Sequence, residues 1–153
     1  MRRFICSVTA LMMITSIAHA VSLRAPEAGL LWNNRVVLVF DGEGGRIAQQ
    51  QVTLMETAAY DWRDRNLVLI AAKATDAVKV WHQGQLSQSQ EKWITGLSSA
   101  DLIKTYGFSG MPGQSALIGK DGGIKLRVFG AIKNSILFET IDVMPMRQRE
   151  MGR

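Results

Sequence analysis

Two continuous apolar runs dominate the hydrophobic pattern of the sequence. Residues 35–40 read Arg-Val-Val-Leu-Val-Phe and residues 67–72 read Leu-Val-Leu-Ile-Ala-Ala, without polar alternation. Such runs are typical of strands covered on both faces, as in an α/β sheet. Residues 46–60 carry apolar positions at helical spacing, namely Ala48, Val52, Met55 and Ala59. The pattern therefore predicts a right-handed β-α-β unit with parallel strands.

A β-hairpin is predicted between residues 114 and 130. Two β-prone runs flank Lys120-Asp121-Gly122-Gly123, and Asp-Gly is typical of a two-residue type I′ turn, whose central residues both need positive φ. The register that follows places on one face the pairs Gly119–Ile124, Leu117–Leu126 and Ser115–Val128. The other face then carries the pairs Ile118–Lys125 and Ala116–Arg127.

Two shorter helices are expected around the hairpin. Ser98 is an N-cap signal and Gly107 stands where a C-terminal glycine belongs, so residues 99–106 should form a helix of about two turns. After the hairpin, Asn134 suits an N-cap and Pro145 should stop the last helix. Its inward stripe would consist of Leu137, Ile141 and Met144.

Several polar stretches are expected outside the core. Residues 61–66 are predicted as a charged turn, residues 83–90 as an exposed loop rich in Gln, Ser and Gly, and residues 146–153 as a basic tail. Residues 78–81 are predicted as a short strand within an insertion that spans residues 73–96.

The first twenty residues have the pattern of a secretory leader. Arg2 and Arg3 form a positive start, an apolar run follows to Ile17, and Ala18-His19-Ala20 matches the small-x-small cleavage pattern. We therefore expect Sec-type cleavage after Ala20 and a periplasmic or secreted product without a transmembrane anchor. The remaining chain would comprise an N-terminal arm at residues 21–29 and a single domain at residues 30–153.

Loss of the leader would restrict the chemistry that the chain can perform. Of 153 residues with a formal net charge of +5, removal of Arg2 and Arg3 leaves +3, which is too mild to indicate a nucleic-acid partner. The sole cysteine, Cys6, would also be removed. Because disulfide exchange and peroxide reduction need a thiolate, thiol oxidoreductase and peroxidase activities are excluded for the mature chain. No cofactor is expected.

The predicted order of elements resembles the thioredoxin-like layout. Residues 35–40 resemble the strand before a thioredoxin active site, residues 106–112 the approach to the cis-proline loop, and residues 117–123 the hairpin that follows. The resemblance implies an α/β three-layer sandwich, with a βαβ unit followed by a helix, a β-hairpin and a C-terminal helix. The Cys-x-x-Cys positions would fall near residues 45–48, which contain no thiol, and Pro112 stands farther ahead of the hairpin than in thioredoxins.

The sequence more closely resembles a family of secreted bacterial domains of unknown function, a domain shared with sushi-repeat and coiled-coil extracellular matrix proteins of animals. The resemblance covers residues 30–151 and is carried by two long motifs, residues 117–127 and residues 141–151. Trp32-x-x-Arg35 and Trp62-Arg-Asp-Arg65 support it more weakly. It implies secretion and a thioredoxin- or peroxiredoxin-like fold, and it brings no catalytic residue with it.

Charged side chains of the hairpin and tail form the leading candidate site. If the terminal helix packs on the hairpin, the tail approaches the second hairpin strand and creates a positive patch for a small anion or an acidic envelope protein. The alternative is that these charges protect an edge strand and solvate a tail. The candidate binding residues are Lys120, Asp121, Lys125, Arg127, Arg147, Arg149 and Glu150.

The leading hypothesis is thus a non-redox binding module, with two alternatives. An enzyme could use a non-thiol site at Asp41 to Arg46, with Glu43 and Arg46 as acid/base and anion-binding groups. Copper(I) could bind the thioethers of Met144 and Met146, although core packing explains these residues as well. The tryptophans are expected in core or edge positions, and an exposed pair would mark a binding surface; they are Trp32, Trp62, Trp81 and Trp93.

Overall fold

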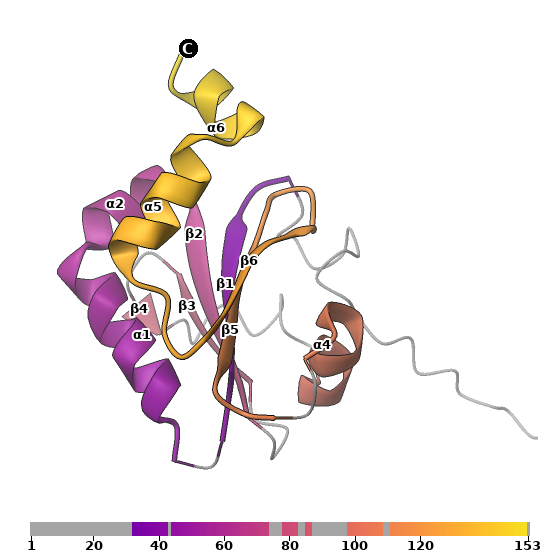
Figure 1. The fold of residues 1–153 in the computed structure, drawn as a ribbon. Helices are drawn as coiled ribbons and strands as arrows, with labels where there is room; N and C mark the ends of the chain where they lie inside the picture. The colour runs from indigo at the N-terminus through magenta and orange to yellow at the C-terminus, as the bar shows by residue number, and fades with distance from the viewer. Residues whose placement is uncertain are drawn as a thin grey trace, which may run out of the picture.

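A computed structural model describes residues 32–42, 44–73, 78–82, 85–86, 98–108 and 111–152 of the chain. The predicted leader and the arm at residues 21–29 lie outside the described residues. Within the described part, six strands form one mixed sheet in the order β4-β3-β2-β1-β5-β6, with helices on both faces (Figure 1). None of the described helices is long and apolar enough to cross a membrane.

The central strand β1 pairs in parallel with β2 and antiparallel with β5, while β2–β3 and β5–β6 are antiparallel pairs. The predicted βαβ unit and thioredoxin-like sandwich are therefore confirmed. The elements in chain order are β1 (Arg35–Asp41), α1 (Arg46–Thr57), α2 (Ala59–Asp64), β2 (Leu67–Lys73), β3 (Val78–His82), β4 (Gln85–Leu86), α4 (Ser99–Tyr106), β5 (Gln114–Ile118), β6 (Ile124–Phe129), α5 (Asn134–Asp142) and α6 (Pro145–Glu150).

The sheet separates two apolar cores. Successive residues of a strand point to opposite faces, so Leu38 contributes to the core beneath α4, whereas Val37 and Val39 contribute to the core beneath α1, α2 and α5. Every residue of β1 is buried. Burial on both faces explains why residues 35–40 show no polar alternation.

The helical segment after β1 is longer than predicted. Residues 61–66 were expected to form a charged turn, but α2 continues to Asp64. Trp62 drives this continuation because its ring is only 1% exposed and its Nε1 donates to Asn134 Oδ1 at 3.0 Å. The prediction that Asn134 is an N-cap is also wrong, since Lys133 holds that position and the Asn134 amide donates to Leu54 O.

Two further boundaries differ from the sequence prediction. Pro145 begins α6 instead of stopping the last helix, since its fixed φ suits a first helical position and its missing N–H is not needed there. Residues 146–150 are consequently helical instead of tail-like. Within the predicted loop at residues 83–90, β4 pairs with β3, and the other residues of that loop lie outside the described ranges.

The hairpin register is correct along the strands and wrong at the turn. Observed pairs include Ser115–Val128, Ala116–Arg127 and Leu117–Leu126, but Ile118 pairs with Ile124 after a register shift. Gly122 N donates to Gly119 O, and Gly119 N donates to Gly123 O, both at 2.9 Å. Gly122 has a φ of +75° whereas Asp121 is not among the positive-φ residues, so a three-residue loop with a glycine bulge replaces the type I′ turn.

Replacing Gly122 by alanine should lower the free energy of unfolding by about 1–2 kcal/mol, because a Cβ is disfavoured in the left-handed region. Asparagine tolerates this region better, so Gly122→Asn should lose less. Urea denaturation followed by circular dichroism measures both variants. Equal losses in the two variants would contradict the left-handed conformation of Gly122.

Candidate functional site

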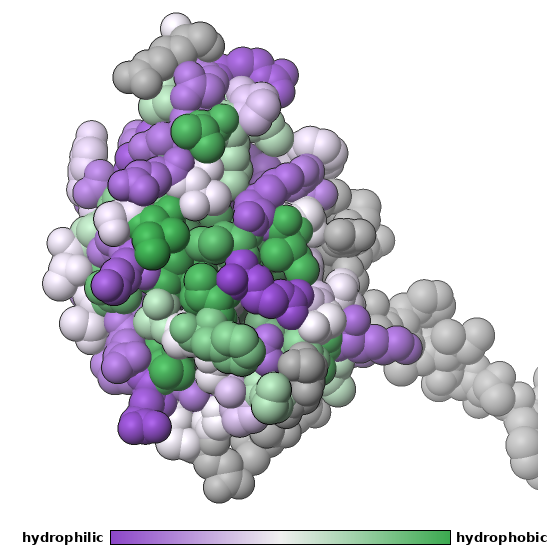
Figure 2. Space-filling view, viewed as in Figure 1, coloured by the Kyte–Doolittle hydropathy of each residue, from purple (hydrophilic) through white to green (hydrophobic). Residues whose placement is uncertain are grey.

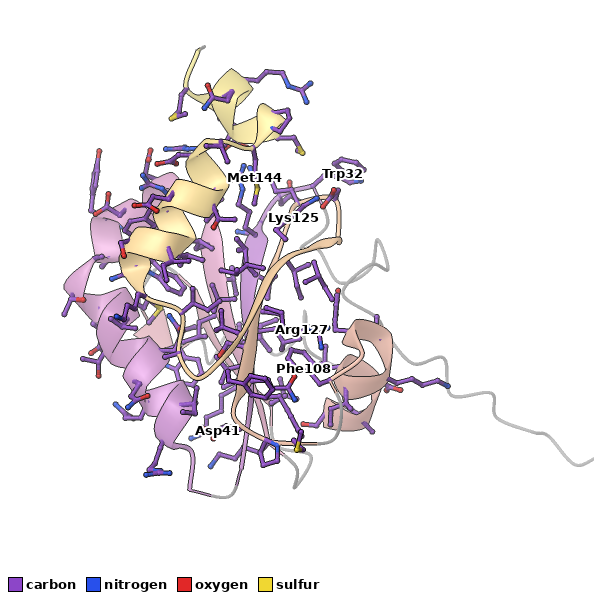
Figure 3. The ribbon with its side chains drawn as sticks, viewed as in Figure 1. Trp32, Asp41, Phe108, Lys125, Arg127 and Met144 are labelled. Atoms are coloured by element: carbon purple, nitrogen blue, oxygen red, sulfur yellow. The ribbon has the colours of Figure 1, made fainter. Side chains whose placement is uncertain are left out.

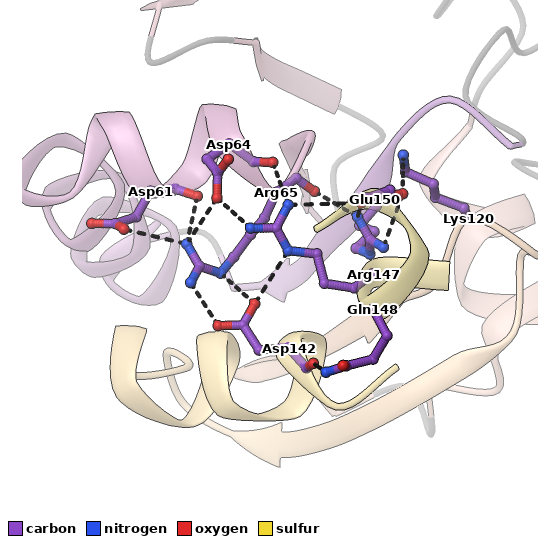
Figure 4. A network of polar contacts seen from close by, with 9 residues as sticks. Asp61, Asp64, Arg65, Lys120, Asp142, Arg147, Gln148 and Glu150 are labelled. Carbon is purple, nitrogen blue, oxygen red and sulfur yellow. Dashed lines mark hydrogen bonds and ion pairs between the residues drawn. The ribbon is translucent and has the colours of Figure 1, made fainter. Parts of the chain in front are cut away.

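One carboxylate of α6 joins the C-terminal helix to the sheet. Glu150 accepts hydrogen bonds from Arg35 of β1 at 3.1 and 3.3 Å, and from Lys120 of the hairpin at 2.7 Å (Figure 4). The Arg35 side chain is 1% exposed and also donates to Arg65 O at 2.9 Å. A buried cation without a partner is costly, so the charge of Arg35 requires the carboxylate of Glu150 to neutralise it.

The same network continues along the α2–α5 side. Arg65 Nη2 lies 2.7 Å from Asp142 Oδ2, and its guanidinium stacks on the ring of Phe138 at 4.4 Å. Arg147, which is buried, donates to the carboxylate of Asp64 and, from Nε, to Asp142 Oδ1 at 3.4 Å. The cations come from β1 (Arg35), from the turn before β2 (Arg65) and from α6 (Arg147). They alternate with carboxylates of α2, α5 and α6, as Figure 4 shows.

These contacts shift the acid side chains toward the charged form. Burial alone would raise the pKa of Glu150, but hydrogen bonds and charges from Lys120 and Arg35 outweigh burial and lower it. For Asp142, burial likewise acts to raise the pKa, and the contacts with Arg65 and Arg147 lower it overall. Both carboxylates therefore remain ionised where an isolated one would begin to protonate.

The structure places the predicted binding residues in different settings instead of one positive patch. Lys120, Arg147 and Glu150 belong to the network, and Lys125 pairs with Asp121 at 2.6 Å beside the turn.

The other two predicted binding residues lie outside the network. Arg127 is directed toward α4, lies over the ring of Phe108 and donates to Gly107 O. Arg149 is exposed and donates to Pro145 O. The hairpin and α6 do meet, through the Lys120–Glu150 contact.

A cavity of about 470 Å³ lies where the hairpin tip meets the α5–α6 corner. We call it the hairpin-tip cavity; it is lined by Val143, Met144, Pro145 and Met146 on one side, and by Arg35, Gly119, Lys120, Asp121 and Lys125 on the other. Trp32 N donates to Lys120 O at 2.7 Å, so Trp32 stands beside it. Figure 3 shows Trp32, Lys125 and Met144 at this same end of the sheet.

Two exposed apolar residues flank the hairpin-tip cavity and form its rim. Val143 lines the cavity and is 76% exposed, and Trp32, whose backbone N–H donates to Lys120, is 62% exposed. Elsewhere on this face, apolar residues reach the surface over the hairpin and α5 among hydrophilic ones (Figure 2). Trp32 also has a φ of +66°, an uncommon backbone conformation for a large side chain. Sequence reasoning did not identify Val143, although its place beside the Met-Pro-Met motif was a usable signal.

The charges around the hairpin-tip cavity nearly cancel and do not select a metal cation. Met144 and Met146 both line the cavity, together with Arg35, Lys120, Lys125 and Asp121. The cations are paired with carboxylates, Arg35 and Lys120 with Glu150 and Lys125 with Asp121. The described residues contain no cluster of three or more His, Cys, Asp or Glu side chains that could hold a metal.

The alternative site at Asp41 to Arg46 forms a smaller hollow of about 260 Å³ against Pro112 and Gly113. The buried Asp41 carboxylate accepts from Gly42 N and Ala48 N, both at 2.8 Å. It thereby caps the start of α1, where Gly45 has no side chain to do so. Glu43 lies outside the described residues, and no described peptide bond is cis, including the one before Pro112.

Comparison with known proteins identifies the family but no activity. The sequence model described as Domain of unknown function (DUF4174) matches residues 28–150. The chain belongs to this family. No curated protein matches the sequence. The residues of the ion network lie in the motifs that carry the family resemblance, namely Arg35, Asp64, Arg65, Asp142, Arg147 and Glu150.

Among solved structures, the pneumococcal exposed lipoprotein thioredoxin Etrx1 from Streptococcus pneumoniae has 19% sequence identity and a TM-score of 0.47, covering 76% of this chain and 90% of its own. StoA from Bacillus subtilis has 17% identity and a TM-score of 0.41, with coverage of 71% and 82%. The N-terminal domain of PilB from Neisseria gonorrhoeae has 19% identity and a TM-score of 0.42, with coverage of 72% and 77%. These similarities assign no activity, and the fold assignment rests on the strand pairings.

Sequence reasoning named the cations of the hairpin and tail, with Asp121 and Glu150 beside them, but missed Asp64 and Asp142. Arg147 was expected as a binding residue of a basic tail, yet it is buried against Asp64 and Asp142. The signal was present in Trp62-Arg-Asp-Arg65 and Ile141-Asp142, because each motif places an acid near a residue of the core. A search for motifs of opposite charge that could pair would have suggested the contact of Arg147 with these two acids.

Acidification should weaken the fold through Asp142 and Glu150. Their pKa values in the folded state lie below the ordinary values of 3.8 and 4.5, so the unfolded chain binds protons first. The stabilisation is complete above about pH 5.5 and is lost as the pH falls through the lowered pKa values. Urea denaturation between pH 7 and pH 3 should show this loss, with a flatter profile for Asp142→Asn combined with Glu150→Gln. If the free energy of unfolding of this double variant fell with pH as steeply as that of the parent, the pH dependence could not be assigned to Asp142 and Glu150.

The two arginines of α6 should differ in their effect on stability. Arg147→Glu should lower the free energy of unfolding by about 3 kcal/mol or more, because it removes a buried cation and adds a carboxylate beside Asp64 and Asp142. Arg149→Glu makes the same charge change at an exposed position and should stay within about 0.5 kcal/mol of the parent. Thermal and urea denaturation provide the comparison. Similar losses at both positions would show that Arg147 is not a structural residue.

Proposed function

We propose that this chain is a secreted, non-redox binding module whose hairpin-tip cavity receives an apolar, acidic segment of another envelope protein. The observation that carries the proposal is the exposed apolar rim, formed by Trp32 and Val143, beside a cavity of about 470 Å³. Exposed aromatic residues next to apolar hollows are typical of protein-binding surfaces. Lys125 also lines the cavity, and because its ion pair with Asp121 is solvent-exposed and therefore weak, its ammonium is available to an acidic group of the partner.

A non-redox role is supported by the corner that would carry thiols in a thioredoxin. Residues 44–48 read Gly-Gly-Arg-Ile-Ala, and the sole cysteine, Cys6, lies in the predicted leader. The nearby Asp41 carboxylate is committed to two backbone N–H groups. A hydrolytic or acid–base enzyme at this corner, with Glu43 and Arg46, is therefore less well supported than a binding module.

Secretion is part of the proposal and rests on the leader pattern at residues 1–20. A periplasmic or extracellular location limits the partner to proteins of the cell envelope or its surroundings. The resemblance to domains in sushi-repeat and coiled-coil matrix proteins is consistent with a role in extracellular protein contacts.

Trp32→Ala and Lys125→Glu should each release a partner captured from native envelope extract by the tagged secreted chain. A central aromatic side chain can contribute about 2 kcal/mol or more, so Trp32→Ala should weaken the purified complex at least about thirtyfold. Quantitative mass spectrometry identifies the partner, and titration calorimetry with that purified protein measures the affinity.

The matched control is Lys104→Glu, because Lys104 is exposed on α4 and does not line the hairpin-tip cavity. It should leave the affinity unchanged. Arg147→Glu is unsuitable as a binding variant because Arg147 is part of the buried ion network. A partner that both Trp32→Ala and Lys125→Glu retain at parental affinity would refute the proposed site.

A further inference from the structure

A second cavity, of about 370 Å³, lies between the start of α1 and the β2–β3 side of the sheet. We call it the cationic pocket because three basic side chains line it and no described acidic residue does. The basic residues are Arg46, Lys73 and Lys79. The apolar part of the lining includes Ala48, Val52, Ala71 and Trp81.

Strand register explains why these side chains converge. In the β2–β3 ladder Ala71 pairs with Lys79, and Lys73 follows Ala71 by two residues, so the three project from the same face. This face is the one that α1 covers. The Lys73 Nζ atom lies 3.5 Å from the point where a Cβ on Gly45 would stand, so the ammonium lies over the N-terminal end of α1.

This arrangement of charges opposes stability. The N-terminal end of a helix carries a partial positive charge, and cations are favoured at the other end. Arg46 is nevertheless the first residue of α1, with Lys73 above the same turn. Across the described ranges, no ion pair involves either residue, in contrast to the paired Arg35 and Arg147. A cluster of like charges around a cavity is typical of a site that receives the opposite charge.

The position of the cationic pocket also suits ligand binding. Lys73 is the last residue of β2, and α1 follows the carboxyl end of the parallel strand β1. In α/β folds, ligands bind in the crevice outside the carboxyl ends of the parallel strands. The volume of about 370 Å³ lies within the usual range of about 300–1,000 Å³ for small-molecule sites.

We propose that the cationic pocket binds a small organic phosphate monoester. Its compact, doubly charged head group would face Arg46, Lys73 and Lys79, since arginine and lysine are the usual partners of phosphate oxygens. Its apolar body would pack against Trp81 and Val52. The site is separate from the hairpin-tip cavity, because the two cavities share no lining residue.

Thermal denaturation of the secreted chain with phenyl phosphate, inorganic phosphate or phenol, at constant ionic strength, tests both parts of the proposed ligand. Phenyl phosphate should raise Tm in a saturable manner, because a ligand that binds only the folded state stabilises it. Inorganic phosphate should produce a smaller rise at equal concentration, and phenol none. Equal effects of phenyl phosphate and inorganic phosphate would overturn the assignment of an organic ligand.

Three variants locate the effect. Lys73→Gln and Lys79→Gln should each weaken phenyl phosphate binding by about tenfold or more, as expected for loss of a hydrogen bond between charged groups. Lys104→Gln, the same change on α4, should leave it unchanged. Without ligand, Lys73→Gln should raise Tm, because it removes a cation from the start of α1. Absence of a saturable rise in the parent protein, or equal affinity in all three variants, would overturn the proposal, whatever the outcome at the hairpin-tip cavity.

Discussion

The architecture depends on the neutralisation of a buried arginine in the central strand. Arg35 begins β1, is almost completely buried, and is matched by the carboxylate of Glu150, a residue 115 positions later in the chain. An unpaired charge at this depth would be strongly destabilising. The C-terminal helix α6 must therefore dock for the buried charge of Arg35 to be neutralised. Glu150 also accepts a hydrogen bond from Lys120 of the hairpin. One carboxylate thereby couples the start of β1, the hairpin and the end of the chain.

Docking of α6 also forms the hairpin-tip cavity. Pro145 turns the chain between α5 and α6 and leaves Val143 exposed, while Arg147 holds the following turn against α2. The corner is thus fixed from both sides by charged contacts in which the cations are buried and the carboxylates partly exposed. A cavity whose walls are fixed in this way loses little conformational entropy on binding, which favours recognition of a partner.

Sequence periodicity was sufficient for the five longer strands of the sheet, and insufficient for β4 and for the charged contacts. The strands β1 and β2 were predictable because burial on both faces leaves a continuous apolar run. The type I′ turn was predicted from Asp121-Gly122 alone, but the Asp121 carboxylate accepts from Gly123 N and binds Lys125, which favours a different loop. The contact of Arg147 with Asp64 joins residues 83 positions apart, and a local pattern carries no information about such pairs. The cationic pocket was missed for the same reason, since Arg46, Lys73 and Lys79 come from three elements.

The two ends of β1 illustrate two uses of charge in one sheet. At its start, Arg35 lies in a network in which cations and carboxylates alternate, so the charges contribute to the fold. At its end, Asp41 is used to cap α1, and the basic side chains beside that helix line a cavity without a described carboxylate. A strand of seven residues separates these ends by about 20 Å, which is beyond the screening length of about 8 Å at physiological ionic strength. The network at one end therefore provides little compensation for the cations at the other, and the anion proposed for the cationic pocket would supply it.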